Sequence, residues 1–305
     1  DWSSDVCSSD LGSLEETRYL ALAKRPAETE VNFKKKPLGS MYLDGESQPY
    51  GPSGTMKKMR LGSMKAHPQL DKYFYQDDLK ATKGAIKLYK KDVPVSKIQD
   101  IFMVGGLGQR ENRKLVPTRW SITAVDDIIG KDIRSKIQRY RRIDHYEIYE
   151  IDYLDNKWII MMMPTNWKYE LIEAWYPGTT WNPTGENITI FGDSEGFEGR
   201  DEYAQIGGCY YAARLAVGEK LKEKKKQAGT VILRESHPGY ILPVGVWNVR
   251  ETVRQALKGK PKEFDNLSSA MKYSSSQLDI PMNEYIQTSD LLKDRVFQTR
   301  MKDFV

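Results

Sequence analysis

The sequence predicts an α+β protein in which helices flank a small, mainly antiparallel sheet, with the chain divided into two parts. Helical spacing of apolar residues dominates several segments of the chain. Three strand-like segments, however, follow one another between residues 146 and 175 without a helix between them. Neighbouring strands with helices before and after them indicate an α+β layer, whereas regular alternation of strand and helix would indicate a parallel sheet.

Residues 12–70 are rich in Gly, Pro, Ser and Lys and are expected to form surface loops. One short helix is predicted for "GSLEETRYLALAK", with Ser13 as its N-cap and Glu16 completing a capping box. Beyond these loops the helical pattern becomes clearer. "DLKATKGAIKLYKK" and "PVSKIQDIFMVG" predict two amphipathic helices.

The middle of the chain predicts a long helix followed by strands. Thr118–Tyr140 places isoleucine and valine at helical spacing. "YEIYEIDYLDNKWIIMMMP" has aromatic and β-branched residues on two arms and predicts a β-hairpin with Asp155–Asn156 at its turn. "YELIEAWYPG" predicts the next strand.

The last part of the sequence predicts one more strand among helices. A connection rich in Gly and acidic residues, near 182–200, is the best internal boundary. After it we expect a long helix from about Tyr203 to Lys226, a buried strand at "TVILRES", and an amphipathic helix that ends at Gly259. Shorter helices then lead to the C-terminal tail.

Composition permits nucleic-acid binding without requiring it. The chain carries 47 basic and 42 acidic residues, a net charge of +5. Basic residues concentrate in Arg139–Arg142 and Lys220–Lys226, for which solvated helix ends are favoured and DNA contact is the alternative. No apolar run approaches the roughly 18 residues of a membrane span, so no membrane partner is expected. Two cysteines, Cys7 and Cys209, suit a reducing cytoplasm and predict no metal site.

A glycine-rich segment with nearby basic residues is a candidate phosphate-binding site. Its residues are Gly105, Gly106, Gly108, Arg110, Arg113, Lys114 and Arg119. Glycines let backbone N–H groups approach an anion, and a helix starting at Thr118 would offer its positive end. The favoured alternative is a helix-to-helix turn whose arginines pair with local carboxylates.

A second candidate site is polar. Arg234, Glu235 and His237 follow a buried strand, and Arg250 lies in the next helix. A Glu–His pair can perform acid–base chemistry or bind a metal. A structural hydrogen-bonding histidine is favoured, because three histidines in the whole chain make a multi-histidine metal site unexpected.

Carboxylates recur along the chain and leave an enzymatic alternative open. They are Asp126, Asp127, Glu170, Glu173, Asp193, Glu195 and Glu198. A metal-dependent nuclease or other phosphodiester-processing enzyme needs two or three of them to converge on an ion. Arg110, Arg113 and Arg119 would then hold phosphate. No complete catalytic motif occurs, so the catalytic residues of such an enzyme are unassigned.

The C-terminal "QTRMKDFV" has the spacing of an anchor motif. Gln298, Met301 and Phe304 lie at i, i+3 and i+6, and Val305 follows. The pattern resembles the motif by which replication and repair proteins bind the ring-shaped sliding clamp, PCNA. Val305 departs from it, because that position is usually Phe or Tyr, and a smaller side chain should weaken binding. The alternative is a tail that packs back onto its own domain.

Several long strings together resemble the archaeal Nre family of DNA-repair proteins. They are "GLGQRENRKLVPTRWSITAVDD", "YELIEAWYPG", "YYAARLAV" and "HPGYILPVGVWNVRE". The resemblance implies a role in DNA-damage repair, clamp binding through the tail, and a location in the archaeal cytoplasm beside the nucleoid. It also implies an N-terminal domain at 12–190, a C-terminal domain at 191–290 and a tail at 291–305. DNA contact through basic surface is expected.

The start of the sequence does not share this resemblance. "DWSSDVCSSDL" is similar to translated sequencing-adapter DNA, so residues 1–11 are interpreted as an artefact. Members of the family usually begin with a short Cys-rich, zinc-binding segment, which is expected upstream of this point. No cofactor is identified within the chain itself.

Overall fold

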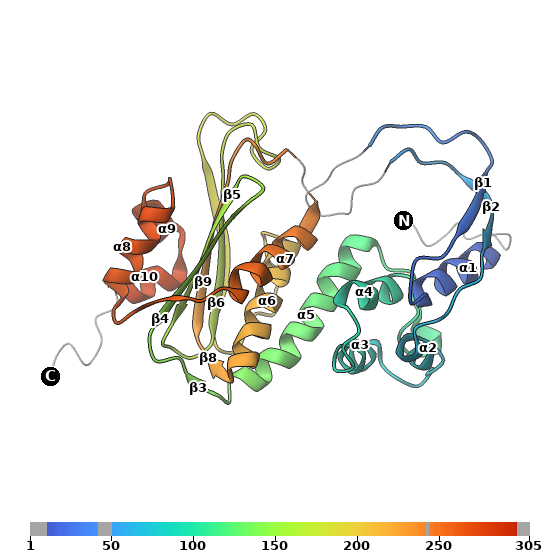
Figure 1. Ribbon diagram of the computed structural model, residues 1–305, viewed down its shortest axis with the longest axis horizontal. Helices are drawn as coiled ribbons and strands as arrows, with labels where there is room; N and C mark the ends of the chain where they lie inside the picture. The colour runs from blue at the N-terminus through green and yellow to red at the C-terminus, as the bar shows by residue number, and fades with distance from the viewer. Residues whose placement is uncertain (1–10, 42–50, 242–243, 298–305) are drawn as a thin grey trace. The chain divides into compact units, whose positions relative to one another are not determined.

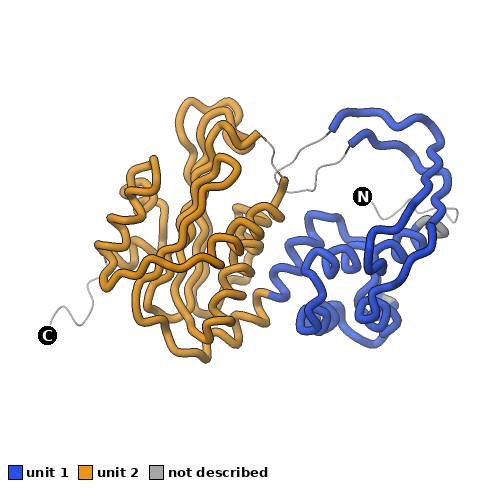
Figure 2. Tube along the Cα trace, in the orientation of Figure 1, with its two compact units in different colours: residues 1–42, 49–129 blue, residues 43–48, 130–305 orange. Residues whose placement is uncertain are grey.

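The computed structural model describes residues 11–41, 51–241 and 244–297. The described residues fall into two compact units, one drawn from 1–42 and 49–129 and the other from 43–48 and 130–305 (Figure 2). None of the described helices is both long and apolar enough to cross a membrane.

The first unit consists of short helices and one hairpin. Its elements are α1 (Leu11–Leu22), β1 (Thr29–Phe33), β2 (Met56–Leu61), α2 (Pro68–Phe74), α3 (Ala81–Tyr89), α4 (Val95–Met103), the 3₁₀ turn η1 (Arg110–Asn112) and the first part of α5 (Thr118–Ile137). Leu22, Leu70, Leu88 and Ile98 are buried where these helices meet. The amphipathic spacing that predicted α3, α4 and α5 is confirmed.

Two expectations for this unit were wrong. Helix α1 already includes Leu11, so Ser13 lies inside the helix and cannot be its N-cap. Part of the expected surface loop is an antiparallel hairpin, in which Thr29 pairs with Leu61. Most side chains of these two strands are exposed, and strands without a buried face lack the hydrophobic alternation that sequence patterns detect.

The second unit is built on a six-stranded sheet with the order β10-β4-β5-β9-β6-β7. The strands are β4 (Tyr146–Tyr153), β5 (Asn156–Met163), β6 (Lys168–Trp175), β7 (Thr189–Glu195), β9 (Gly229–Ser236) and β10 (Lys262–Phe264). Every neighbouring pair is antiparallel except β6 with β9. The predicted α+β class with a mainly antiparallel sheet is therefore confirmed.

Helices cover both faces of this sheet (Figure 1). On one face lie α6 (Gly208–Lys224) and α7 (Gly245–Lys258), which contact β6 and β4. On the other lie α8 (Leu267–Gln277), α9 (Met282–Thr288) and α10 (Asp290–Phe297), which contact β4, β5, β6 and β7. We call these the α6–α7 face and the α8–α10 face.

The strands alternate between two apolar cores. Ile148, Met161, Val231 and Ile172 belong to the cluster beneath α8–α10. Trp158 and Ile232 lie one residue out of phase with these and point to the other face, since side chains alternate along a strand. Strands β5 and β9, in the middle of the sheet, are buried along nearly their whole length, which explains their long apolar runs.

Three local details differ from the sequence expectation. The β4–β5 turn is formed by Leu154 and Asp155, both with positive φ (52° and 53°), and Asn156 already begins β5. Two-residue hairpin turns of this kind need positive φ at both central positions. The connection expected near residues 182–200 contains the edge strand β7. Helix α6 begins at Gly208, later than expected.

Candidate functional site

The glycines of the candidate phosphate site are buried by close packing. Gly105 has a φ of +66°, and a Cβ atom there would lie 2.8 Å from the carbonyl oxygen of Lys114. A Cβ atom on Gly106 would lie 2.4 Å from Cδ1 of Ile101. The turn between α4 and α5 therefore requires glycine for its own backbone geometry, without reference to an anion.

The basic residues of this segment are held differently from one another. The Arg113 Nε donates to the carbonyl of Gly108 at 2.8 Å, and its guanidinium lies 3.2 Å from the Asp77 carboxylate. Burial lowers the pKa of Arg113. Arg110, Lys114 and Arg119 are exposed. Arg113 thus adopts the favoured structural alternative, and the phosphate site stays a prediction.

The second candidate site is divided between the two faces of the sheet. Arg234 and Glu235 are consecutive on β9, so their side chains point to opposite faces. Arg250 is buried on α7, which covers the face opposite Glu235. Only Glu235 and His237 of the predicted set therefore lie together.

On the α8–α10 face, Glu235 is fully buried and receives several hydrogen bonds. Its Oε1 accepts from the backbone N–H of Ile280 at 2.8 Å and from the Tyr285 hydroxyl at 3.1 Å. Its Oε2 accepts from the backbone N–H of Asp279 at 3.0 Å. The carboxylate therefore fixes the segment between α8 and α9 on the end of β9.

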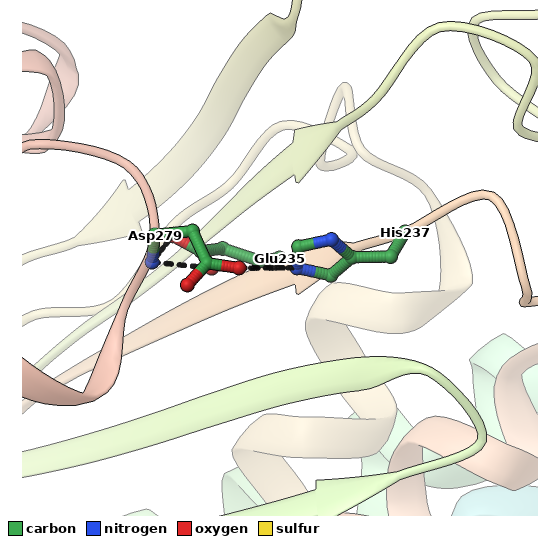
Figure 3. Close-up of side chains that lie close together, drawn as sticks. All are labelled: Glu235, His237 and Asp279. Carbon is green, nitrogen blue, oxygen red and sulfur yellow. Dashed lines mark hydrogen bonds and ion pairs between the residues drawn. The ribbon is translucent and has the colours of Figure 1, made fainter.

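His237 and Asp279 complete a cluster with Glu235 at this end of the sheet (Figure 3). The Nε2 of His237 lies 3.5 Å from Oε2 of Glu235 and 3.7 Å from Oδ2 of Asp279. The imidazole stacks on Tyr176 with ring centroids 4.3 Å apart. Burial, together with the charges of Glu235 and Asp279, raises the pKa of Tyr176 to about 12. Sequence reasoning missed Asp279 because it lies far along the chain in a turn between helices.

Glu170 is the second buried carboxylate of the α8–α10 face. It accepts from the Ser289 hydroxyl, from the backbone N–H of Asp290 at 2.7 Å and from that of Leu291 at 3.2 Å. These donors are at the N-terminal end of α10, where a negative charge is favourable. Burial nevertheless raises the pKa of Glu170 to about 7.

On the α6–α7 face, the buried glutamates are paired with cations. Arg234 donates to Glu173 at 2.8 Å and to Asn156 at 2.9 Å. Its guanidinium lies 4.8 Å from the ring centroid of Trp158 and 4.7 Å from that of Trp175. Arg234 is thus satisfied by a carboxylate and an amide while enclosed by aromatic rings.

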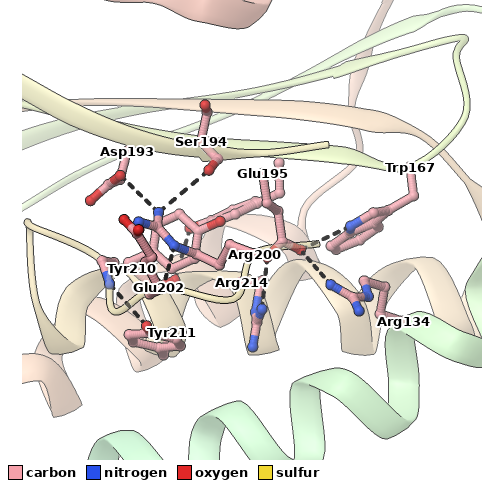
Figure 4. A network of polar contacts seen from close by, with 12 residues as sticks. Arg134, Trp167, Asp193, Ser194, Glu195, Arg200, Glu202, Tyr210, Tyr211 and Arg214 are labelled. Atoms are coloured by element: carbon pink, nitrogen blue, oxygen red, sulfur yellow. Dashed lines mark hydrogen bonds and ion pairs between the residues drawn. The ribbon is translucent and has the colours of Figure 1, made fainter. Parts of the chain in front are cut away.

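Glu195, at the end of β7, is the centre of a larger network on the same face (Figure 4). It accepts from Arg214 of α6 at 2.8 Å and from the Trp167 indole at 3.0 Å, and Arg134 lies 3.7 Å away. Nearby, Arg200 pairs with Asp193 at 2.7 Å. Together these contacts attach the edge strand to α5 and α6.

No three of the candidate carboxylates form a group with metal-ligand spacing among the residues that the structure describes. Glu170 holds α10, Glu173 pairs with Arg234, and Glu195 pairs with Arg214. Asp126 is buried in α5 and accepts from the Gln99 amide at 3.0 Å. Each of these four carboxylates therefore has a structural partner among the described residues. The one group of three potential metal ligands among the described residues is Glu235, His237 and Asp279.

The two basic runs of the sequence meet in space. Strand β3 (Arg141–Arg142) and strand β8 (Lys226–Gln227) form a short parallel ladder, with Arg141 opposite Lys226. We define the basic surface by its exposed members, Arg139, Arg141, Arg142 and Lys225. Lys226 pairs with Asp144 at 2.9 Å, so it contributes less free charge.

A hollow of about 280 Å³ connects this surface to α10. Its lining includes Arg142 and, from α10, Asp294 and Arg295. Asp294 pairs with Lys168 at 2.7 Å. The basic surface therefore adjoins the last described helix, which ends at Phe297. The predicted clamp-binding residues Gln298, Met301, Phe304 and Val305 lie outside the described residues.

Comparison with known proteins gives matches over nearly the whole chain. The family model "Archaeal Nre, N-terminal" matches residues 3–182, and "Archaeal Nre, C-terminal" matches residues 195–304. No solved structure matches the chain significantly.

Curated relatives match over similar lengths. The DNA repair protein NreB of Archaeoglobus fulgidus is 39% identical over 281 residues, which are 92% of this chain and 71% of the relative. The DNA repair protein NreA of Haloferax volcanii is 34% identical over 307 residues, covering 98% of this chain and 72% of the relative. NreA of Archaeoglobus fulgidus is 35% identical over 266 residues, covering 87% and 67%.

Proposed function

The chain belongs to the archaeal Nre family, and from this premise we propose that it is a DNA-repair factor that binds the sliding clamp and contacts DNA. The repair role is supported by relatives named as DNA repair proteins that align with 87 to 98% of the chain. The convergence of the two basic runs on one surface is the observation that carries the DNA contact.

Clamp binding is proposed for the tail. Met301 and Phe304 are apolar anchors among charged neighbours, and Gln298 supplies a hydrogen-bonding group at the start of the motif. A few apolar anchors filling a pocket can provide most of the affinity of such a short segment. The tail follows α10 directly in the sequence, and α10 adjoins the basic surface at the hollow lined by Arg142 and Arg295.

Calorimetric titration of an archaeal sliding clamp tests this part of the proposal. We expect a dissociation constant in the micromolar range, which corresponds to a binding free energy of about −8 kcal/mol. In Phe304→Ala this binding should be lost. Phe297→Ala is the matched control, because Phe297 is also an exposed phenylalanine close to the tail but lies outside the motif. Equal binding by Phe304→Ala and the unaltered chain would refute the assignment of the anchor.

DNA contact is proposed for the basic surface. Arg139, Arg141, Arg142 and Lys225 are exposed and come from two segments distant in sequence. Guanidinium and ammonium groups that contact phosphates release condensed counterions, which makes binding weaker as salt rises. The basic surface is therefore expected to bind DNA with little sequence preference.

The double variant Arg141→Gln/Arg142→Gln tests this surface in fluorescence anisotropy with duplex DNA at several salt concentrations. We expect weaker binding. The slope of log affinity against log salt concentration should also become shallower, by the equivalent of up to about two phosphate contacts. Lys35→Gln/Lys36→Gln, in the exposed segment of the first unit, removes the same charge and is the control. An equal loss of affinity in both variants would mean that net charge alone, and not this surface, determines binding.

A further inference from the structure

The end of β9 carries a cluster whose spacing suits a metal ion better than hydrogen bonds. The His237 Nε2 lies 3.5 Å and 3.7 Å from one oxygen each of Glu235 and Asp279. Hydrogen bonds between nitrogen and oxygen are typically about 2.7–3.2 Å long. Ligands at about 2.0–2.1 Å from a tetrahedral zinc ion are roughly 3.4 Å apart. The observed separations are close to the edges of such a tetrahedron.

The histidine is held in position with its ligand atom available. Its ring stacks on Tyr176, and its backbone N–H donates to the carbonyl of Asp155 at 3.0 Å. The Nε2 atom is buried and makes no hydrogen bond within the described structure. A buried polar atom without a hydrogen bond is costly. The arrangement therefore leaves a specific nitrogen that an ion could satisfy.

Glu235 and Asp279 each direct one carboxylate oxygen toward the His237 imidazole. Oε1 of Glu235 is occupied by the Ile280 N–H and the Tyr285 hydroxyl, whereas Oε2 accepts only the Asp279 N–H and faces His237. Oδ1 of Asp279 pairs with Lys157 at 2.6 Å, and Oδ2 faces His237. Hydrogen bonds from such outer partners orient metal ligands.

From this geometry we propose that Glu235, His237 and Asp279 bind one divalent metal ion of the zinc class. One imidazole and two carboxylates, without a thiolate, suit Zn²⁺ and to a lesser degree Mn²⁺. Three protein ligands leave a fourth position for water. The Asp279 side chain is 51% exposed, so solvent and the ion can reach the site.

The site goes beyond clamp and DNA binding because it uses a different part of the molecule. The ion would connect the end of β9 to the turn between α8 and α9, where Asp279 lies. It would therefore stabilise the α8–α10 layer on the sheet, because any ligand that binds only the folded state adds to stability. The expected signature is a melting temperature that rises with zinc concentration.

The test uses the full chain with Cys7→Ser, which removes the cysteine outside the described residues. After treatment with a chelator and dialysis, Zn²⁺ is titrated by calorimetry, and Co²⁺ is added separately to record its visible spectrum. We expect one Zn²⁺ per chain, a rise in melting temperature, and a Co²⁺ spectrum of tetrahedral intensity without thiolate bands.

Asp279→Asn and His237→Asn should each weaken Zn²⁺ binding at least tenfold. Asp279 is half exposed, so its variant is expected to fold. His145→Asn is the matched control, because His145 also lies near a carboxylate, 3.2 Å from Asp265, but on an exposed pair. The proposal would be overturned if the unaltered chain did not bind zinc, or if Asp279→Asn and His237→Asn bound it as tightly as the unaltered chain does.

Discussion

The two faces of the six-stranded sheet both bury glutamate, but they neutralise it in different ways. On the α6–α7 face, the partners are cations: Lys224 for Glu147, Arg234 for Glu173 and Arg214 for Glu195. On the α8–α10 face, Glu170 and Glu235 are held mainly by backbone N–H groups and hydroxyls. One face therefore contains buried ion pairs, and the other contains carboxylates that cap helices and turns.

The difference has a physical consequence for each face. A buried charge with a charged partner stays ionised, and removing the partner leaves it unpaired at high cost. A buried carboxylate with neutral donors is penalised by desolvation, and protonation relieves that penalty. The α6–α7 face should therefore be sensitive to loss of a single side chain, and the α8–α10 face to pH.

The largest effect is expected for Arg234→Met. It removes the partner of Glu173 while keeping an apolar side chain between the tryptophans. We expect a loss of about 3–5 kcal/mol in the free energy of unfolding, measured with urea. The double variant Arg234→Met/Glu173→Gln should recover much of this loss, because no unpaired charge then remains. A loss below about 1 kcal/mol in the single variant would contradict a buried ion pair on this face.

The second effect is a pH dependence due to Glu170. Burial raises its pKa to about 7 in the folded chain, above the value of 4.5 expected when unfolded. The folded state then binds the proton more tightly, so the contribution of Glu170 to stability is fully present below about pH 4.5 and is lost as pH rises through 7. The difference of about 2.5 between the folded and unfolded pKa values of Glu170 corresponds to roughly 3 kcal/mol in the free energy of unfolding.

The comparison that isolates this effect is between the unaltered chain and Glu170→Gln, unfolded with urea from pH 5 to pH 8. The unaltered chain should lose stability relative to the variant as pH rises. Parallel curves would show that the neutral donors of the α8–α10 face hold the Glu170 carboxylate in its charged form at all these values.

A smaller effect is expected for Ser289→Ala. The Ser289 hydroxyl donates to Glu170 and accepts from the Leu292 N–H at 2.8 Å, so it acts as the N-cap of α10. Loss of a serine cap typically costs about 1 kcal/mol. Chemical denaturation measures it, and Ser276→Ala, at an exposed serine in α8, is the control. An unchanged stability would mean that Glu170 alone holds the start of α10.

The central strands could be anticipated from the sequence, but the partners of their buried polar residues could not. The sequence correctly predicted β5 as an arm of a hairpin and β9 as a buried strand. The hairpin turn was placed one residue late, because Asn156 is a common turn residue but here begins β5. Strand β7 was missed as a strand because its Gly- and acid-rich sequence suits a half-buried edge.

The candidate sites also depend on contacts between residues distant in the sequence, which the sequence pattern does not predict. Glu235 and His237 are two residues apart and were recognised together, whereas Asp279 joins them only through packing of the α8–α9 turn. The basic runs were visible in the sequence, but their meeting in the β3–β8 ladder depends on long-range pairing that periodicity does not encode. Close backbone packing and anion binding both favour glycine, so the sequence alone does not separate these two roles for Gly105 and Gly106.

The comparison of the two faces also bears on function, because α10 leads into the tail and is held by Glu170 on the α8–α10 face. The basic surface adjoins the same helix through the hollow lined by Arg142 and Arg295. Tail and surface are thus attached to one unit of the protein. Simultaneous binding of clamp and DNA by one unit should raise the apparent affinity for DNA on which the clamp is loaded.

The most direct measurement is the affinity of the chain for a primer–template duplex, with and without the loaded clamp. We expect the clamp to strengthen binding by about 100-fold or more. In Phe304→Ala this increase should disappear while affinity for bare DNA is kept. An equal affinity for bare and clamp-loaded DNA, or an increase that survives Phe304→Ala, would contradict a clamp-bound repair factor anchored by its tail.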